Sequence, residues 1–433
     1  MTRTLLAGGR IIDPASRRDA PGDLLIEDDR IAAVGDVGRT GEARTVLDCT
    51  GLFVVPGLID LHVHLREAPF SKSPDAFAET VASGAAAAVA GGFTTVCAMP
   101  NTTPPIDSAD AIAWYVKRGT EANLARVLPV GCMTRGRDGR VPANLAAMRD
   151  DGACAFSDDG ADVADDAVFE QVLREAARIG IPAFCHCENA AVADGGLLHD
   201  SPIATVLGLP GLSRDAEDVA VARACDAAQR TGCRVHIQHV STEGAVETVR
   251  RAKADAAPVT AEATPHHLTL TVDALAGRDT VFKVNPPLRT GHDVDAVLAA
   301  VRDGTIDCLA TDHAPHTAEA KARRLAEAPF GMIGLESALG VYATTLVETP
   351  LMTWPELIDR MTAAPARVLG IDAGTLAVGA RADVTVIDPA ARWTIDPERF
   401  ASKARNCPFA GREVKGRVVR TLVGGRVVYE ATA

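Results

Sequence analysis

Short apolar runs that end in polar residues recur through the middle of the chain and alternate with longer segments of helical periodicity. Eight of these runs have the length and the β-branched content of buried strands. Between most of them lie Ala-rich stretches, such as residues 79–92 and 166–180, with apolar residues at helical spacing. We expect the strands at residues 58–65, 93–100, 126–133, 153–158, 181–187, 234–240, 258–264 and 305–312.

This alternation predicts an α/β fold with a large central domain. Eight strand–helix units are typical of a (β/α)8 TIM-type barrel with a closed parallel sheet, expected over residues 57–368. Both ends of the chain instead contain short strand-like segments broken by Gly and Asp. Neither end is long enough to bury a core alone, so residues 1–56 and 369–433 are expected to pair into one small β-sandwich domain.

Composition narrows the classes of partner. The 433 residues carry a net charge of −13, which argues against nucleic acid or an anionic membrane surface as a partner. It leaves an anionic substrate open, because a local Arg or a metal ion can reverse the field inside a pocket. No apolar stretch approaches a membrane span, and the ten cysteines are scattered, so we expect a cytoplasmic protein with free, buried cysteines.

Residues suited to metal binding collect where the expected strands end. Active sites of such barrels lie at the carboxyl ends of the strands, and strand alternation places His62 and His64 on one face. Four imidazoles and the carboxylates on one rim suit two metal ions with nitrogen and oxygen ligands, zinc being the natural candidate. The candidates at the strand ends are His62, His64, Asp158 or Asp159, His186, His239 and Asp312.

A series of motifs makes the pattern specific. In chain order they are PGLIDLHVHLRE, GGFTTVCAMPNT, FSDDG, HCEN, HVST, TPHHL, NPPLR, ATDHAPHT and APFG. The series resembles the dihydroorotase family, and in particular the bacterial class in which an aspartate bridges two metals. The resemblance covers residues 1 to about 430, whereas the H-x-H motif alone would indicate only the amidohydrolase superfamily.

The resemblance implies a ligand for each metal. His62 and His64 would hold one ion together with Asp312. His186 and His239 would hold the other, and Asp159, rather than Asp158, would bridge the two. The implied cofactor is two Zn²⁺ per subunit, with the occupancy of the second site left open.

Related dihydropyrimidinases and most allantoinases bridge their metals with a carboxylated lysine on the fourth strand. This chain has no lysine between Lys117 and Lys253. The absence favours the dihydroorotase class over another cyclic amidohydrolase, such as an allantoinase or a hydantoinase.

The implied reaction is the reversible interconversion of (S)-dihydroorotate and N-carbamoyl-L-aspartate in de novo pyrimidine biosynthesis. A metal-bridging hydroxide would attack the ring amide, since metal binding makes water a nucleophile at neutral pH. Asp312 would take its proton and pass it to the leaving ring nitrogen. The alternative that Asp312 serves only as a metal ligand stays open.

The substrate contacts come partly from spacing and partly from the resemblance. Arg66 continues the face of the H-x-H pair, and its guanidinium suits a carboxylate, although a surface ion pair is the alternative. The resemblance implies that Asn101 and His316 join Arg66 at the substrate carboxylate; Asn101 in a turn is the other interpretation. Further implied contacts are His64, Asn285 and the backbone of Phe330 and Gly331.

Other residues receive weaker interpretations. Glu262, within the seventh strand, could anchor a neighbouring Arg or His, His236 is expected to pack, and His199 is expected at the surface. One departure from the family stands out: Arg66 is followed by Glu-Ala-Pro-Phe and a longer segment over residues 71–79. This segment puts in doubt the angle at which Arg66 approaches the substrate.

The partners follow from these hypotheses. We expect a small-molecule substrate and no nucleic acid or membrane, and the resemblance implies a homodimer. A complex with aspartate carbamoyltransferase is open. A hypothesis of a different class is a non-catalytic scaffold that binds a partner enzyme, against which the complete ligand set argues.

Overall fold

The computed structural model describes residues 2–37, 45–73 and 76–432. Its centre is an eight-stranded parallel sheet in the order β15-β14-β13-β10-β9-β8-β7-β6. Beyond β6 and β15 the His64 amide donates to the His313 carbonyl at 2.8 Å, which brings the two edges together into a nearly closed barrel. All eight expected strands are present: β6 (Leu58–Val63), β7 (Phe93–Ala98), β8 (Arg126–Gly131), β9 (Ala155–Phe156), β10 (Ala183–Cys185), β13 (Val235–Ile237), β14 (Val259–Ala263) and β15 (Cys308–Leu309).

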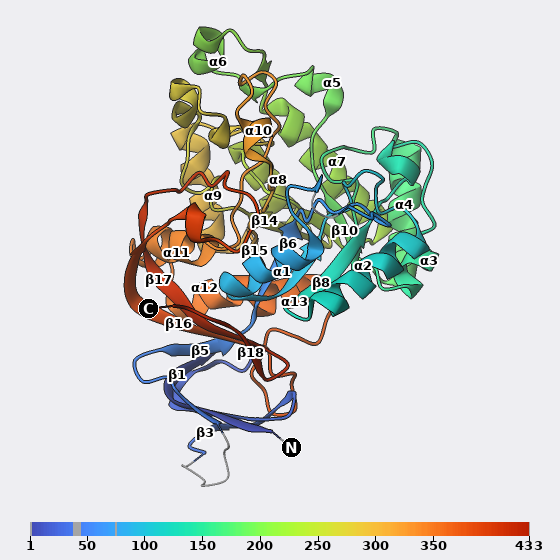
Figure 1. Cartoon of the computed structure of the whole chain (residues 1–433). Helices are drawn as coiled ribbons and strands as arrows, with labels where there is room; N and C mark the ends of the chain where they lie inside the picture. Colours follow the sequence, from blue (N-terminus) through green and yellow to red (C-terminus); the bar gives the residue numbers. More distant parts are fainter. Residues whose placement is uncertain (1, 38–44, 74–75, 433) are drawn as a thin grey trace.

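Helices surround this sheet (Figure 1). Helix α4 (Asp166–Ile179) shows why: the Asp165 side chain caps its first turn, Gly180 ends it at φ 76°, and Phe169 and Val172 lie on its buried face. The other barrel helices are α1 (Val81–Ala90), α2 (Ala109–Ala122), α3 (Leu145–Asp150), α7 (Asp215–Thr231), α8 (Glu243–Ala254), α9 (Gly291–Asp303), α11 (Ala338–Tyr342), α12 (Trp354–Met361) and α13 (Ala363–Leu369).

Shorter elements lie mostly in the connections. They are α5 (Ala190–Ala193), α6 (Pro202–Leu207), α10 (Ala318–Lys321), the strand pair β11 (Leu198–His199) and β12 (Gly211–Leu212), and single turns of 3-10 or π-helix at Arg135–Arg137, Val272–Gly277, Thr280–Phe282, Ala343–Val347 and Pro397–Arg399. Helices α5 and α6 lie at the top of Figure 1, far from both chain ends, and α10 lies below them.

The two ends of the chain form one further sheet, at the bottom of Figure 1. Its order is β18-β17-β16-β5-β1-β2-β3, and β4 pairs with β1. Its two halves share one apolar core, in which Leu6 and Leu24 belong to the same cluster as Val384 and Leu422. The strands are β1 (Arg3–Asp13), β2 (Arg18–Glu27), β3 (Arg30–Gly35), β4 (Thr45–Asp48), β5 (Phe53–Pro56), β16 (Val384–Thr394), β17 (Glu413–Val423) and β18 (Arg426–Glu430).

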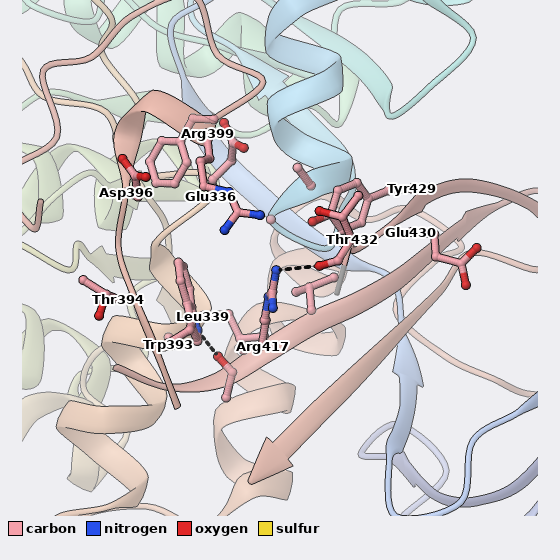
Figure 2. A pocket seen from close by; sticks show the side chains of 16 residues that line it. Glu336, Leu339, Trp393, Thr394, Asp396, Arg399, Arg417, Tyr429, Glu430 and Thr432 are labelled. Atoms are coloured by element: carbon pink, nitrogen blue, oxygen red, sulfur yellow. Dashed lines mark hydrogen bonds between the residues drawn. The ribbon is translucent and has the colours of Figure 1, made fainter. Parts of the chain in front are cut away.

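The sheet and the barrel are joined at helix α1. Thr421 Oγ1 donates to the Val89 carbonyl at 2.7 Å, and Thr385 Oγ1 donates to the Gly92 carbonyl at 2.6 Å. A cavity of about 210 Å³ remains at this junction, and Glu336, Trp393 and Arg417 are among its lining residues (Figure 2). We propose the division predicted above, with residues 57–368 as the barrel and residues 1–56 and 369–433 as the small domain.

The cysteines follow the expectation from composition, since all ten are free and all but Cys154 are buried. Within the described ranges, no helix has the length and apolar character needed to cross a membrane.

Candidate active site

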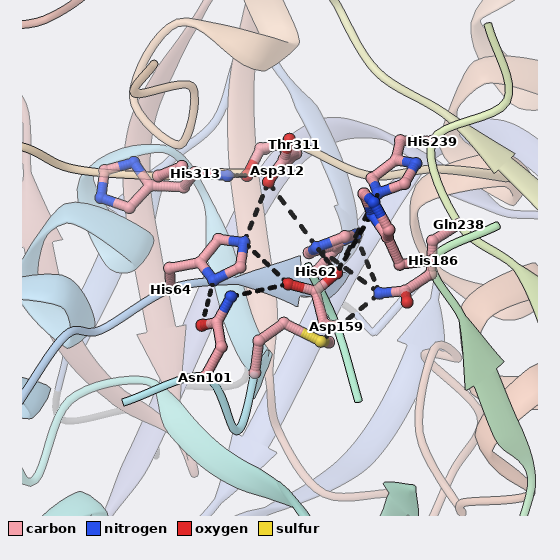
Figure 3. A network of polar contacts seen from close by, with 12 residues as sticks. His62, His64, Asn101, Asp159, His186, Gln238, His239, Thr311, Asp312 and His313 are labelled. Atoms are coloured by element: carbon pink, nitrogen blue, oxygen red, sulfur yellow. Dashed lines mark hydrogen bonds and ion pairs between the residues drawn. The ribbon is translucent and has the colours of Figure 1, made fainter. Parts of the chain in front are cut away.

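The carboxyl ends of the barrel strands bring a buried cluster of imidazoles and carboxylates together (Figure 3). His62 Nε2 lies 3.3 Å from Asp159 Oδ1 and 3.6 Å from Asp312 Oδ1. His64 Nε2 lies 3.1 Å from Asp312 Oδ1 and 3.6 Å from Asp159 Oδ2. Both histidines of the H-x-H motif therefore face the same two carboxylates, as strand alternation predicts.

Two more imidazoles approach Asp159 from β10 and β13. His186 Nδ1 and His239 Nε2 are 2.8 Å apart, and they lie 3.9 Å and 4.0 Å from Asp159 Oδ1. Asp159 thus lies between the H-x-H pair and this second pair of histidines. The opposite nitrogen of His186 is buried and has no hydrogen-bond partner among the residues that the structure describes.

The two aspartates of FSDDG have different surroundings. Asp158 accepts hydrogen bonds from the Met133 amide at 2.8 Å, the Thr134 amide at 3.2 Å and the Thr134 hydroxyl. It therefore holds the loop that follows β8, while its neighbour Asp159 faces the histidines.

Electrostatics of the cluster fit a bound cation. Burial opposes an imidazolium at His62, but the carboxylates of Asp159 and Asp312 hold its pKa well above the usual value. Burial also opposes a charged Asp159, yet His62 and the other imidazoles keep its pKa well below the usual value. Two groups offer atoms within reach of one ion: His62 with His64 and Asp312, and His62 with Asp159 and His239. A nitrogen and oxygen donor set of this kind suits zinc.

The backbone at the strand ends is strained. Arg66, His239 and Asp312 have φ of 57°, 33° and 47°, in the left-handed region that residues other than glycine rarely adopt. Such conformations persist only where the surroundings hold them, and they cluster at functional sites. They turn these side chains off the line of their strands and toward the rim.

Glu262, on β14, is fully buried in the barrel interior and accepts hydrogen bonds from two histidines. Its Oε1 accepts from His62 Nδ1 at 2.8 Å and its Oε2 accepts from His236 Nε2 at 3.1 Å. The expected anchoring of a histidine by Glu262 is confirmed. Gln238 is a contact that the sequence did not indicate: its Nε2 lies 3.1 Å from His62 Nδ1, and its Oε1 accepts from the Ser157 hydroxyl. Only the packed fold brings it to His62.

The expected carboxylate-binding residues fall into two groups. Arg66 Nη2 lies 3.4 Å from His316 Nε2, and His316 Nε2 lies 2.7 Å from the Phe330 carbonyl, to which it can donate. Asn101 instead joins two cluster residues, with Oδ1 2.8 Å from His64 Nδ1 and Nδ2 donating to Asp159 Oδ2 at 2.9 Å. Arg66 and His316 are thus together, and Asn101 is beside the cluster.

Asn285 offers an unused hydrogen-bond acceptor. Its Nδ2 donates to Glu188 Oε2 at 2.8 Å, whereas its Oδ1 is buried and has no partner within the described part of the chain. Gly331 lies in the left-handed region at φ 131°, and a Cβ there would lie 2.8 Å from Ala314 Cβ.

The loop after the first barrel strand is described over residues 66–73. Pro74 and Asp75, in the longer segment that departs from the family pattern, lie outside the described residues.

A buried ion pair supports the loop after β13. Arg289 donates to Glu217 Oε2 at 3.1 Å and to the Ser241 hydroxyl at 3.0 Å, and Glu217 accepts from the Ser241 amide. His199 lies 3.4 Å from the same guanidinium and is 4% exposed. The expectation that His199 lies at the surface is wrong, because the β11–β12 pair folds it against Arg289.

Comparison with known proteins shows the family to which the chain belongs. The sequence profile of the amidohydrolase family matches residues 53–428. The chain belongs to the amidohydrolase family. Curated relatives named dihydroorotase are similar over the full length: that of Pelotomaculum thermopropionicum is 47% identical, and that of Syntrophus aciditrophicus is 42% identical, each alignment covering 99% of both chains.

Solved structures of two other proteins have the same fold as this amidohydrolase. The L-hydantoinase (dihydropyrimidinase) from Arthrobacter aurescens has a TM-score of 0.84 and 27% identity, and the comparison covers 99% of this chain and 96% of that one. The dihydropyrimidinase from Brevibacillus agri has a TM-score of 0.86 at 24% identity, over 99% and 95% of the chains, which shows the fold alone.

Proposed function

We propose that this amidohydrolase is a dihydroorotase that interconverts (S)-dihydroorotate and N-carbamoyl-L-aspartate. The observation that carries the proposal is Asp159, an aspartate at the end of the fourth barrel strand with histidines on both sides. The full-length relatives that are named dihydroorotase support the same activity.

The proposed metal ligands follow the distances within the cluster. His62, His64 and Asp312 would hold one Zn²⁺, His186 and His239 would hold a second, and Asp159 would contact both. When bound, the ions would supply Lewis acidity and lower the pKa of water to about 7. Both carboxylates are buried, so the charges of the ions would also offset the cost of desolvating them.

Asp312 is the proposed catalytic residue. Its carboxylate adjoins the imidazoles of both His62 and His64, at the open end of the barrel. In the hydrolytic direction it would accept a proton from the attacking water and deliver it to the leaving ring nitrogen. In the biosynthetic direction the same carboxylate would take the proton from the carbamoyl nitrogen.

The side chains around the cluster suit a cyclic substrate that carries a carboxylate. Arg66 and His316 would bind the substrate carboxylate, with Asn101 and His64 at the side of the cluster. The unpartnered Oδ1 of Asn285 would accept from a ring N–H, and the backbone of Phe330 and Gly331 would contact the other amide edge. A buried acceptor without a partner is costly, so a ligand donor at this place is favourable.

The second candidate is a hydantoinase, favoured by the solved structures with the same fold. Its class relies on a carboxylated lysine on the fourth strand, and residues 118–252 of this chain contain no lysine.

The proposed partners are a second copy of the chain, in a homodimer, and aspartate carbamoyltransferase, in a complex. The proposed location of the protein is the cytoplasm.

The test is a turnover assay on purified, zinc-supplemented protein. L-dihydroorotate, dihydrouracil, hydantoin and allantoin are offered side by side, with a chelator-treated sample as control. Metal-dependent hydrolysis of dihydroorotate alone is expected. Preference for an uncharged ring would retain the metal site and overturn the substrate, and inactivity toward all four would favour the scaffold hypothesis.

A further inference from the structure

Lys283 has its ammonium group inside a cage of backbone carbonyls. The residue is 1% exposed, and its Nζ donates to the carbonyls of Leu325 at 2.8 Å, Ala326 at 3.3 Å and Ala328 at 2.8 Å. An ammonium group has three N–H donors, so this cage uses every one of them. All three carbonyls belong to the segment between α10 and the candidate site.

Lys321, in α10, makes a second cage beside the first. Its Nζ donates to the carbonyls of Pro329 at 3.0 Å, Gly331 at 2.8 Å and Lys283 at 3.4 Å, and the residue is 8% exposed. Neither ammonium group lies within 4.0 Å of a carboxylate oxygen among the residues that the structure describes. Buried lysines are ordinarily paired with a carboxylate, so two that bind only carbonyls need a particular explanation.

The two cages connect directly to the proposed substrate contacts. The Gly331 amide donates to the Lys283 carbonyl at 2.9 Å, and the Lys283 ammonium lies 4.6 Å from the centre of the Phe330 ring. Two residues after Lys283 comes Asn285, with its unpartnered Oδ1. The lysines therefore tie together the two segments that would contact the ring.

We propose that Lys283 and Lys321 are positioning residues, which fold the 325–331 segment over the site by binding its carbonyls and so hold Phe330 and Gly331 against the substrate. The part of this proposal that concerns the substrate rests on the dihydroorotase function proposed above. The part that concerns the fold of the segment does not.

The cages are suited to opening as well as closing. Leu325 and Ala328 of the segment are buried, and the charge-assisted hydrogen bonds from the two lysines add to this apolar packing in holding the closed form. Burial lowers the pKa of Lys321 to about 7, which reflects the cost of keeping its charge from water. Opening would return the ammonium to solvent, so the closed form is held without being permanent.

The experiment compares Lys283→Met, Lys321→Met and Lys321→Gln with the wild-type, full-length, zinc-loaded protein. Methionine retains all but the last atom of the lysine side chain and loses the donors, whereas glutamine retains two donors. Lys253→Met is the control for loss of a lysine away from the segment, because Lys253 donates to the Gly304 carbonyl and to the Asp307 carboxylate at the opposite end of the barrel. Hydrogen exchange of the amides of residues 325–331 and the KM and kcat for dihydroorotate are measured for each.

In both Met variants we expect exchange of the 325–331 amides to rise about tenfold or more, as loss of charged hydrogen bonds at a buried site implies. KM should rise by a similar factor and more than kcat falls, Lys321→Gln should be intermediate, and Lys253→Met should match the wild type. Should a Met variant fail to fold, Lys321→Gln and Lys283→Gln carry the test.

Three outcomes would overturn the proposal. Met variants that match the wild type while the Gln variants are impaired would indicate a space-filling role. Faster exchange with unchanged KM would mean that the segment does not hold substrate contacts. Unchanged exchange in every variant would mean that the lysines do not hold the segment. If the wild type does not hydrolyse dihydroorotate, the proposed function fails, and exchange alone decides the role of the lysines.

Discussion

Replacement of Glu262 by Gln tests how the cluster is oriented. Glu262 accepts one hydrogen bond from His62 Nδ1 and another from His236 Nε2, so its two oxygens fix the tautomers of both rings. A glutamine has only one side-chain oxygen. It can accept from one of the two histidines and must present an N–H to the other, which then has to change its tautomer or lose its bond.

The expected magnitude follows from the geometry. Loss of a partner that orients a metal-binding histidine typically lowers metal affinity 10- to 100-fold, or roughly 1.4–2.8 kcal/mol. Glu262 contacts the two imidazoles at 2.8 Å and 3.1 Å and its carboxylate is fully buried, so we expect Glu262→Gln to lie in the upper half of that range. Its kcat at saturating zinc should fall less than its zinc affinity.

The assay is a competition titration of zinc against a chromophoric chelator. Asp383→Asn is the control, since Asp383 is also buried but accepts from the Gly424 amide at the sheet junction. If Glu262→Gln retains wild-type zinc affinity while its thermal stability drops, Glu262 only supports packing of the barrel interior and the reasoning fails.

Three further predictions follow from the site and from the junction. Asp312→Asn should lower kcat by about a thousandfold through loss of the proton-transfer group; a proportional loss of bound zinc would assign Asp312 the role of a ligand alone. Arg66→Lys should raise KM for dihydroorotate about tenfold or more, through loss of the planar fork, and leave dihydrouracil hydrolysis unchanged; equal effects on both would remove the carboxylate contact. Burial raises the pKa of Glu336 to about 7, so its contribution is present below pH 4.5 and lost as the pH rises to 7. Denaturant unfolding of Glu336→Gln should therefore show a gain over the wild type at pH 8 relative to pH 4.5, on the order of 3 kcal/mol at about 1.4 kcal/mol per pKa unit.

The sequence predicted the barrel because its evidence is local. A short apolar run in the sequence predicts each strand, and all eight predicted runs are strands in the structure. Their ends were less predictable. The run at residues 153–158 shortens to β9 (Ala155–Phe156), because Asp158 leaves the strand to accept from the loop after β8. Asp312 and His239, which follow β15 and β13, have positive φ, which the strand pattern did not predict.

The cluster of histidines and aspartates was predictable because its members lie at or just after the ends of strands, and the barrel brings strand ends together. The contacts between distant loops were not. Lys321 lies in a stretch of helical composition, and nothing near it in sequence indicates a cage of carbonyls around its ammonium group. Arg289 and Glu217 likewise meet only once two connections have packed, so an isolated Arg gives no local signal of an ion pair.

The terminal sheet also sets the order in which the protein can be completed. Strand β5 pairs with β1 on one side and with β16 on the other, and β16 is synthesised only after residues 57–383. During translation the edge of β5 that later pairs with β16 therefore has unpaired backbone groups, and such an edge can pair with other chains and aggregate. Chains released before residue 384 should accumulate in the insoluble fraction, whereas the full-length chain remains soluble. Strand β16 therefore covers the open edge of β5 only after the whole barrel has been synthesised.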